Sequence, residues 1–548
     1  MAHGGKSLVD CLQTLGARHG FGVPGESYLA ALDAMHDTHG AFDFVLCRNE
    51  GGAGFMAAAY GKLTGTPGLC FVTRGPGATN ASIGVHTAMQ DSAPMILFVG
   101  QIDTRTRERE MFQEVDYRAV FGTMAKWTTE IEHVERIPEI VSRAWTVAMS
   151  GRPGPVVVAL PENVLSAETE TAPLSRASVL PAPQASPADI EKVQQHLAAA
   201  ERPVILIGGC GWNDVGSRAL EHFANASNIP VVAAFRYIDS YDNTQPSYAG
   251  EAGVGMLPEV QQTLSESDLL LAIGVRLGEM TTNNYQLFDV PEMQQTLIHV
   301  HASSGELGKI YRPNLAIQCG ANDFVTTLKP INRSKDWMQA ARARYEATFD
   351  LPSQPGELDM VEVTRHVQDR LADDAIVTNG AGNFSIWNNK YLRYGPQQRL
   401  LAPQSGAMGY GLPAAIAAKV VHPDRQVICF AGDGDFQMNL PELGTAMQAG
   451  ACPVVLIVNN GSYGTIRMHQ ERHYPHRVSA TELQNPDFAA LARSYGFHSE
   501  QVTKTEDFAD AFERALNSPT GAVLDLVTGI EPLTPKMTLS KIRAQAKP

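Results

Sequence analysis

Short runs of consecutive apolar residues recur along the chain and alternate with longer stretches of helical character. The last third shows this most clearly, with AIVTN (375–379), QVICFAG (426–432) and PVVLIVN (453–459). Comparable runs occupy residues 69–73, 95–100, 203–209, 230–235 and 268–274. Strands that are apolar at every position are typical of parallel sheets covered by helices on both faces. The pattern therefore predicts an α/β protein built of doubly wound parallel sheets.

Two segments interrupt this pattern and divide the chain. Residues 166–188 are rich in Pro, Ser and Ala and have no periodicity, and residues 350–358 form a shorter stretch of the same kind. Both compositions are loop signals. A length of 548 residues is enough for about three domains. We therefore predict three domains, at residues 1–175, 188–345 and 358–548.

The first and last segments repeat one arrangement. FVTRGPGATN leads to HTAMQDSAPMILFVG, and later CFAGDGDFQMN leads to GTAMQAGACPVVLIVNN. In both places a strand ends in a glycine-rich turn, a helix carries TAMQ, and a second strand follows. Four shared letters can recur by chance, but the matching context favours two related domains.

Composition and charge exclude several classes of function. Asp and Glu total 58 against 43 Lys and Arg, and the net charge of −15 argues against nucleic-acid or membrane partners, which need basic surfaces. The seven cysteines are dispersed without a CxxC pair, which indicates reduced thiols in a cytoplasmic protein. The N-terminal residues show no apolar signal-peptide region, and no apolar run reaches membrane-spanning length.

The stretch from Gly432 to Asn460 carries the most specific chemistry. A predicted strand at 426–431 ends in Gly432-Asp433-Gly434, and a second predicted strand at 453–458 is followed by Asn460. Because parallel strands present their carboxyl ends at one edge of a sheet, Asp433 and Asn460 are expected to converge on one crevice. Their oxygens suit Mg²⁺, and the glycines allow a phosphate to approach the backbone closely. The alternative is a plain tight turn.

The connection between these strands is predicted to be a helix at 440–449 that ends at Gly450. Asn439 has the character of an N-cap, and Glu442 stands three residues later, as in a capping box.

A GDG motif followed by some two dozen residues and NN is similar to the signature of thiamin-diphosphate enzymes, and the chain resembles their acetolactate synthase-like branch. The resemblance implies a pyrimidine-binding domain, a central Rossmann-like domain and a diphosphate-binding domain. It implies that Asp433, Asn460 and the Ser462 carbonyl hold Mg²⁺, while Gly434 and Asp435 offer backbone N–H groups to the diphosphate. The remaining cofactor contacts it places in the last domain are Asn383, Gly406, Met408, Gly432, Tyr463, Gly464, Thr465 and Ile466.

Glu50 is the predicted catalytic carboxyl group. The aminopyrimidine of the cofactor needs a carboxyl partner of raised pKa, and Glu50 stands in the apolar, small-residue stretch NEGGAGFMAAAYG. The alternative is a first-turn glutamate stabilised by the helix dipole. In the family, this glutamate and the metal-binding aspartate reach one cofactor from different subunits, which implies a homodimer or a tetramer.

Met408 follows Gly406 in SGAMGYG and resembles the bulky residue that holds the cofactor bent, with the Gly406 carbonyl accepting from the aminopyrimidine amine. The alternative is ordinary core packing, for which Met is well suited.

The substrate pocket is predicted from weaker signals. By resemblance, Phe112 and Gln113 of MFQEVD reach the site, with Gln113 as a predicted catalytic residue. Gly25, Glu26 and Ser27 of VPGES are predicted to reach the same pocket. His469, beside His473 and His476, is predicted as a general acid or base in a mobile lid, with a solvated charged loop as the alternative. His86 is expected to be an ordinary helix histidine.

Several positions depart from the acetolactate synthase pattern. Asn383 and Phe384 replace a Gln-His pair, Glu162 stands in place of a lysine, and Met280 lies near where an arginine is expected. His469 occupies the position of the tryptophan that selects the second substrate.

Taken together, the residues and the resemblance predict a thiamin-diphosphate- and Mg²⁺-dependent lyase or carboligase acting on a 2-oxo acid. The alternatives are a flavin-linked oxidase, a simple decarboxylase, and a cofactor-binding protein without turnover. The central segment has only a weak nucleotide signal in GGCGWNDVG (208–216), and GEAGVGM (250–256) replaces the Gly-Met-His-Gly element of flavin-binding relatives. We therefore expect no tightly bound flavin (FAD).

Overall fold

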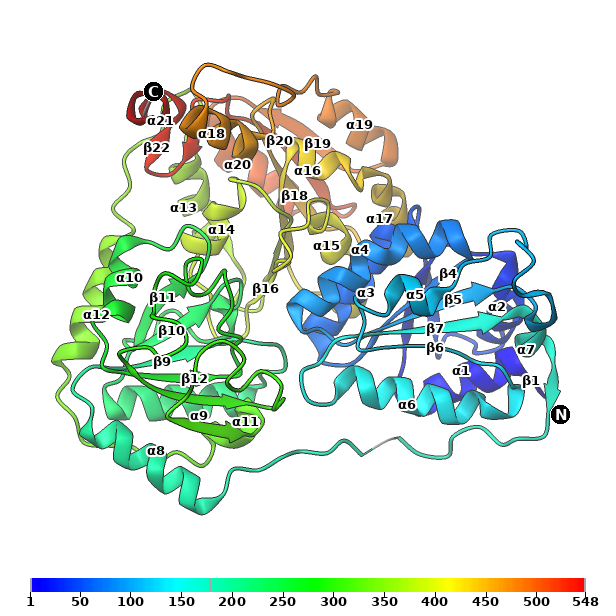
Figure 1. Cartoon of the computed structure of the whole chain (residues 1–548). Coiled ribbons are helices and arrows are strands. Elements are labelled where there is room, and N and C mark those ends of the chain that lie inside the picture. The colour runs from blue at the N-terminus through cyan, green and yellow to red at the C-terminus, as the bar shows by residue number, and fades with distance from the viewer. Residues whose placement is uncertain (1, 178, 547–548) are drawn as a thin grey trace.

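A computed structural model describes residues 2–177 and 179–546 of the chain. Its three six-stranded sheets are parallel throughout, and helices flank them, which confirms the predicted α/β class (Figure 1). Each sheet lies within one of the three predicted segments, and the boundaries themselves stay predictions. Within the described residues, no helix combines the length and the apolar character that crossing a membrane requires.

The first sheet has the strand order β3-β2-β4-β5-β7-β6. Its strands are β2 (His19–Gly22), β3 (Asp43–Leu46), β4 (Gly68–Val72), β5 (Met95–Gln101), β6 (Trp127–Glu130) and β7 (Pro155–Pro161). The helices are α1 (Gly4–Thr14), α2 (Leu29–His36), α3 (Glu50–Thr64), α4 (Gly75–Asp91), α5 (Tyr117–Phe121), α6 (Ile137–Met149) and α7 (Glu162–Ser166). A small antiparallel pair joins β1 (Ala2–His3) to β8 (Glu168–Thr169).

The central sheet has the order β11-β10-β9-β12-β13-β14, which is the Rossmann arrangement that the sequence predicted. Its strands are β9 (Pro203–Ile207), β10 (Val231–Ala234), β11 (Tyr248–Ala252), β12 (Leu269–Ile273), β13 (Thr296–His301) and β14 (Leu315–Gln318). Its helices are α8 (Pro187–Ala199), α9 (Asp214–Ser227), α10 (Pro258–Ser265), α11 (Ala321–Val325) and α12 (Asp336–Ala347). The described residues of the linker before α8 run extended between the first and central domains (Figure 1).

The last sheet has the order β16-β15-β17-β18-β20-β19. Its strands are β15 (Ile376–Asn379), β16 (Arg399–Leu401), β17 (Val427–Gly432), β18 (Val454–Asn459), β19 (His498–Val502) and β20 (Ala522–Val527). The helices are α13 (Met360–Arg370), α14 (Ser385–Lys390), α15 (Gly411–Val421), α16 (Asp433–Gln437), α17 (Leu443–Ala449), α18 (Gly464–His473), α19 (Phe488–Tyr495), α20 (Thr505–Leu516) and α21 (Leu539–Gln545). A hairpin of β21 (Pro532–Thr534) and β22 (Met537–Thr538) precedes α21.

The first and last sheets share one topology. When the six strands of each sheet are numbered in chain order, both sheets have the spatial order 2-1-3-4-6-5. This agreement supports the sequence-based prediction that the two domains are related.

The same two domains share a hydrophobic core. Helix α3 packs on α15, and the rings of Phe55 and Tyr410 meet edge to face at 5.5 Å. Helices α3 and α4 approach so closely at Gly54 and Gly84 that a Cβ atom on Gly84 would lie 2.5 Å from the Gly54 backbone. The small residues after Glu50 are therefore needed for this helix contact.

The predicted capping box is wrong. A 3-10 turn at Leu440–Glu442 precedes α17, and the Asn439 amide donates to the Gly409 carbonyl at 2.8 Å instead of capping a helix. Glu442 is completely buried and accepts hydrogen bonds from the backbone N–H groups of Arg48 and Asn49 at 3.1 and 2.9 Å. These partners in the first domain take precedence over the local capping pattern, whereas the predicted helix end at Gly450 is confirmed.

Candidate active site

A cavity of about 240 Å³ opens at the carboxyl ends of β15 and β17, where the strand order of the last sheet reverses. Open α/β sheets bind ligands at this switch point. Apart from Glu50, every predicted cofactor contact lines this cavity. Its wall is formed by residues between Met360 and Leu533, so within one chain Glu50 lies outside it.

Asp433 is a buried carboxylate of the cavity, at the start of α16. Its Oδ1 accepts from the Gly434 backbone at 2.9 Å, and its Oδ2 accepts from Gly461 N at 2.8 Å and from the Asn485 amide at 2.7 Å. Burial raises the pKa of Asp433 above its ordinary value. The contact with Gly461 confirms that the ends of β17 and β18 converge. Asn485 lies beyond the motif, and sequence reasoning missed it.

Asn460 and Ser462 lie at the tip of β18. The Asn460 Oδ1 accepts from Ser462 N at 3.0 Å, and Gly464 leaves room for the amide, because a Cβ there would lie 2.6 Å from Asn460 Nδ2. In the part of the chain that the structure describes, no three His, Cys, Asp or Glu side chains are grouped to hold a metal. A cation here would rely on one carboxylate together with amide, carbonyl and phosphate oxygens, which suits Mg²⁺.

The Asp435 side chain has a role that sequence reasoning did not find. It is buried, and its Oδ1 accepts from the backbone N–H groups of Ala381 at 3.1 Å and Gly409 at 2.8 Å. A Cβ on Gly380 would lie 2.0 Å from the same oxygen. Burial raises the pKa of this carboxyl group to about 7. The predicted contact of the Asp435 backbone with a diphosphate stays a prediction.

Met408 stands between two glycines with left-handed backbones, Gly406 at φ +65° and Gly409 at φ +81°. A side chain at Gly409 would collide with Met438 and Asn439, so this turn has little freedom to move. Met408 and Gly406 line the cavity side by side with the glycine-rich turn of α16. The predicted wedge is therefore in a position to touch a ligand in the cavity.

The loop after β15 supplies the opposite wall. The Asn383 Oδ1 accepts from the Thr465 hydroxyl at 2.9 Å, which connects this loop to α18. Phe384 is buried against Gly432, where a Cβ would lie 2.7 Å from its ring. Phe384 therefore fills space and donates no hydrogen bond, in contrast to the histidine of the family pattern.

Glu50 is half-buried at the start of α3, where Asn49 caps the helix through a bond from Gly51 N at 2.8 Å. The Asn80 amide donates to Glu50 Oε2 at 2.9 Å and fixes the carboxylate. A Cβ on Gly77 would lie 3.4 Å from the other oxygen, so this glycine leaves the carboxylate accessible.

The predicted substrate residues of the first domain gather around Arg74, which sequence reasoning did not single out. Arg74 is buried and pairs with Glu162 at 3.0 Å and with Glu26 at 3.4 Å. Its guanidinium also donates to the Phe112 carbonyl at 3.3 Å. The sequence offered one indication of a buried cation here, because Glu162 is an acid at a position where the family has a lysine. These contacts hold the 111–116 segment beside the turn after β4.

The other predicted residues of this group have different environments. Ser27 is buried, with its hydroxyl 3.1 Å from the Thr73 hydroxyl, and Gly25 packs on the same Thr73. Gln113 has φ +65° and accepts through its carbonyl from Gly75 N at 3.1 Å. Phe112 is 69% exposed, so in a single chain it contacts no pocket interior.

A second cavity of about 590 Å³ lies between the central and last domains and shares Ala381, Gly382, Asn383, Gly406 and Thr465 with the first. His469, Arg472 and Met280 line it. The ring of His469 stacks on that of His473 with centroids 6.3 Å apart, and burial lowers the pKa of His469 below its ordinary value. The histidine therefore faces a space connected to the cofactor cavity.

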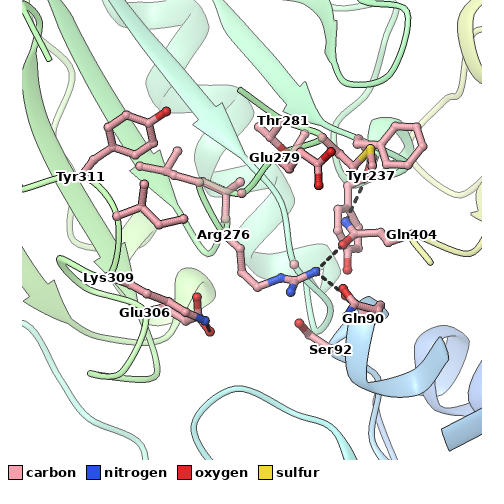
Figure 2. Close-up of a pocket in the computed structure, with 18 of the residues that line it drawn as sticks. Gln90, Ser92, Tyr237, Arg276, Glu279, Thr281, Glu306, Lys309, Tyr311 and Gln404 are labelled. Carbon is pink, nitrogen blue, oxygen red and sulfur yellow. Dashed lines mark hydrogen bonds and ion pairs between the residues drawn. The ribbon is translucent and has the colours of Figure 1, made fainter. Parts of the chain in front are cut away.

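A third cavity of about 360 Å³ lies at the switch point of the central sheet, against the first domain. Figure 2 shows Arg276 crossing it toward Gln90 and Gln404, and the Gln404 contact measures 2.8 Å. His86 reaches this cavity from helix α4. The lining joins residues of the central domain to residues of the first domain, and the expectation of no tightly bound FAD stays a prediction.

Comparison with known proteins agrees with this site. Three models of thiamine pyrophosphate (thiamin diphosphate) enzymes match in order: the N-terminal TPP binding domain at residues 2–120, the central domain at 190–328 and the C-terminal TPP binding domain at 380–526. The chain belongs to the thiamine pyrophosphate enzymes, in the branch that includes the acetolactate synthases. It is therefore a thiamin-diphosphate-dependent enzyme of the transferase or lyase type.

Individual relatives define the branch. The chain is 30% identical to the acetolactate synthase isozyme 2 large subunit of Escherichia coli, with 97% of both chains covered. It is 32% identical to the acetolactate synthase large subunit of Parasynechococcus marenigrum, covering 95% of this chain and 87% of the relative. The mitochondrial acetolactate synthase catalytic subunit of Saccharomyces cerevisiae is 31% identical, with 92% and 77% covered.

Proposed function

We propose that this protein is a Mg²⁺- and thiamin-diphosphate-dependent lyase or carboligase that acts on a 2-oxo acid. The observation that carries the proposal is the cavity at the switch point of the last sheet, where the predicted metal, diphosphate and wedge residues share one wall. Such a site matches the general position of ligands in open α/β sheets.

Asp433, Asn460 and the Ser462 carbonyl would hold the Mg²⁺ ion. Mg²⁺ prefers oxygen ligands and is usually bound through few protein groups together with substrate phosphates. The burial that raises the pKa of Asp433 disfavours its charged form, and a bound cation would offset that cost. The Gly432-Asp433-Gly434 turn leaves its backbone N–H groups near the place where a diphosphate would lie.

When bound, thiamin diphosphate supplies a thiazolium carbon that becomes a nucleophile after it loses a proton. The chain has to hold a proton at the aminopyrimidine ring nitrogen and keep the two rings close together. Glu50, fixed by Asn80, would hold that proton, and Met408 would support the bend. His469 would then exchange a proton with the substrate from the adjoining cavity.

The active unit in this proposal is a dimer, or a tetramer built of dimers. Glu50 lies outside the cofactor cavity of its own chain, so a second chain has to supply it. Exposed apolar side chains lie on both sides of the predicted contact: Ile83, Met111 and Phe112 in the first domain, and Met438 and Ile466 in the last. A C₂ axis would bring two such pairs together and complete two sites.

The substrate would be a small-molecule 2-oxo acid or a related carbonyl compound. A simple decarboxylase is the second candidate, favoured by Met280 and His469, because neither residue matches the groups that select a second substrate in the synthase pattern. The seven cysteines are all free, which supports a cytoplasmic location.

A panel of 2-oxo acids tests the proposal. The purified protein, supplied with thiamin diphosphate and Mg²⁺, is expected to release CO₂ from at least one acid, and product analysis then separates carboligation from simple decarboxylation. A visible flavin absorption band together with electron transfer would favour the oxidase alternative. Calorimetry that finds no binding of thiamin diphosphate in the presence of Mg²⁺ would overturn the proposal.

A further inference from the structure

Arg236 is a buried cation of the central domain that reaches into the cofactor-binding domain. It follows β10, is 5% exposed, and donates from Nη1 to the carbonyls of Gly380 at 3.2 Å and Pro403 at 2.7 Å. Both acceptors belong to the last domain. The Gly380 carbonyl precedes the loop that carries Asn383, and the Pro403 carbonyl precedes the turn that carries Met408.

The same two loops are also held by Asp435. Its Oδ1 accepts from Ala381 N, one residue beyond Gly380, and from Gly409 N, at the far end of the Met408 turn. A guanidinium therefore holds carbonyls of both loops, and a carboxylate holds N–H groups of both loops. We call Arg236, Asp435 and these two loops the wedge clamp.

Arg236 itself is held rigidly. Its backbone N–H donates to Glu251 Oε1 at 2.8 Å, and the Lys390 ammonium donates to Glu251 Oε2 at 2.7 Å. All of these side chains are less than a tenth exposed. Arg236 has φ +62°, in the left-handed region that residues other than glycine seldom adopt. Strained backbone of this kind persists where the surroundings fix it, and it clusters at functional sites.

A purely structural role explains this arginine poorly. Burying a cation is costly unless it is well paired, and the Arg236 Nε has no hydrogen-bond partner in the part of the chain that the structure describes. Burial lowers the pKa of the guanidinium to about 10, so it stays charged near neutral pH. Arg399 is a useful comparison, because it also joins these two domains, through Asp239 O at 3.4 Å, but lines none of the three cavities.

We propose that Arg236 is a positioning residue through which the central domain fixes the Met408 turn and the Asn383 loop for the bent cofactor. This inference rests on the proposed function, since it assigns Met408 the role of a wedge. Arg236 lies outside the lining of the cofactor cavity, although it lines the adjoining cavity of about 590 Å³. It acts through two backbone carbonyls, and Asp435 acts through the two matching N–H groups.

The test uses R236M, which removes the donors at similar volume, and R236K, which keeps the charge but loses the planar head. R399M is the matched control at the same domain junction. Two quantities are measured on the holoenzyme with Mg²⁺: the affinity for thiamin diphosphate by calorimetry, and the rate at which the bound thiazolium carbon exchanges its proton with D₂O. The second readout needs no substrate and reports the bent geometry directly.

We expect R236M to slow the exchange by about 100-fold, the loss that a misplacement of about 1 Å can cause. Cofactor affinity should change by less than about threefold, because Asp433 and Asn460 still hold the diphosphate end. R236K should give an intermediate rate, and R399M should match the wild type. D435A should slow the exchange as well, and R236M/D435A should be clearly non-additive, because both residues hold the same loops.

Unchanged exchange in R236M, or additive effects in the double variant, would overturn the inference. A parallel loss of cofactor affinity and exchange would also overturn it, since that result describes collapse of the cavity rather than a displaced wedge. If R236M fails to fold, R236K and D435A carry the same comparison. Failure of the proposed function is distinguishable, because the wild type itself would then bind no thiamin diphosphate.

Discussion

At the residue scale, the ligand oxygens of the site and the space around them come from different residues. One buried carboxylate, Asp433, accepts hydrogen bonds through both of its oxygens, and Asn460 adds a neutral oxygen at the next strand tip. Glycines around them provide space that any side chain would fill. Chemistry at this site therefore depends on a few oxygens whose positions are fixed by backbone contacts.

Replacing Glu50 by Gln should lower the turnover number by about 100-fold or more, the usual contribution of a positioned acid or base. Gln keeps the hydrogen bond from Asn80 but cannot hold or release the required proton. Steady-state kinetics with the best 2-oxo acid of the panel would measure the loss, and E170Q, on an exposed stretch of the linker, is the control. Wild-type turnover in E50Q would contradict the role given to this carboxyl group.

The variant N460A should weaken thiamin diphosphate binding at saturating Mg²⁺ by about tenfold, or about 1.4 kcal/mol, because the cation loses one oxygen ligand. Calorimetry measures the affinity, and chelation of the metal should reduce it in both proteins. N517A, exposed at the end of α20, should bind like the wild type. Equal affinity of N460A and the wild type would remove Asn460 from the metal site.

At the element scale, α18 carries His469 and is fastened to the C-terminal helix α21 by a charged cluster. Glu471 is completely buried and contacts Arg467 at 3.1 Å and Arg543 at 2.7 Å. Arg543 and the other hydrogen bonds hold the pKa of Glu471 down to about 2. The carboxylate thus stabilises the contact between the two helices.

The sign of the pH dependence follows from this depressed pKa. Because the folded-state pKa of Glu471 lies below its unfolded value of 4.5, the stabilisation is complete above about pH 4.5 and is lost as the pH falls toward 2. We expect E471Q to destabilise the docking of α21 by about 3 kcal/mol at neutral pH, as for a broken buried pair. Amide hydrogen exchange in α21 would measure the loss of stability. The difference in stability between E471Q and the wild type should shrink below pH 4.5. A difference that is independent of pH would contradict it.

Elements whose determinants are local could be predicted from the sequence. The strands ending at Gly432 and Asn459 are continuous apolar runs, and their parallel pairing brings Asp433 and Asn460 together. The capping box failed because Glu442 finds its partners 393 and 394 residues away, in the first domain. The role of Arg236 could not be predicted from the sequence for the same reason, since its two carbonyl partners are 144 and 167 residues distant. Contacts of this range depend on how domains dock, which no local pattern records.

At the scale of the whole molecule, the proposed site needs two chains. Mixing E50Q and D433A subunits provides a direct test. In a randomly mixed population, half of the dimers are hybrids, and each hybrid has one site with both intact residues, so activity should return to about a quarter of the wild-type value. Each variant alone should be nearly inactive. If the mixture stays as inactive as its components, the two residues serve the same chain and the interface site is wrong.

The wedge clamp also limits how freely this chain can be recombined with its relatives. Its cation comes from one segment of the polypeptide, while its carboxylate and both loops come from another. A chimera that imports a foreign middle segment without an arginine at position 236 would remove one donor from each of the Gly380 and Pro403 carbonyls, which would keep only their bonds from Asn379 and Gly406. Asp435 would then be the remaining side chain of the wedge clamp that holds both loops. Engineers exchanging modules among these enzymes should therefore transfer Arg236 and Asp435 as a pair.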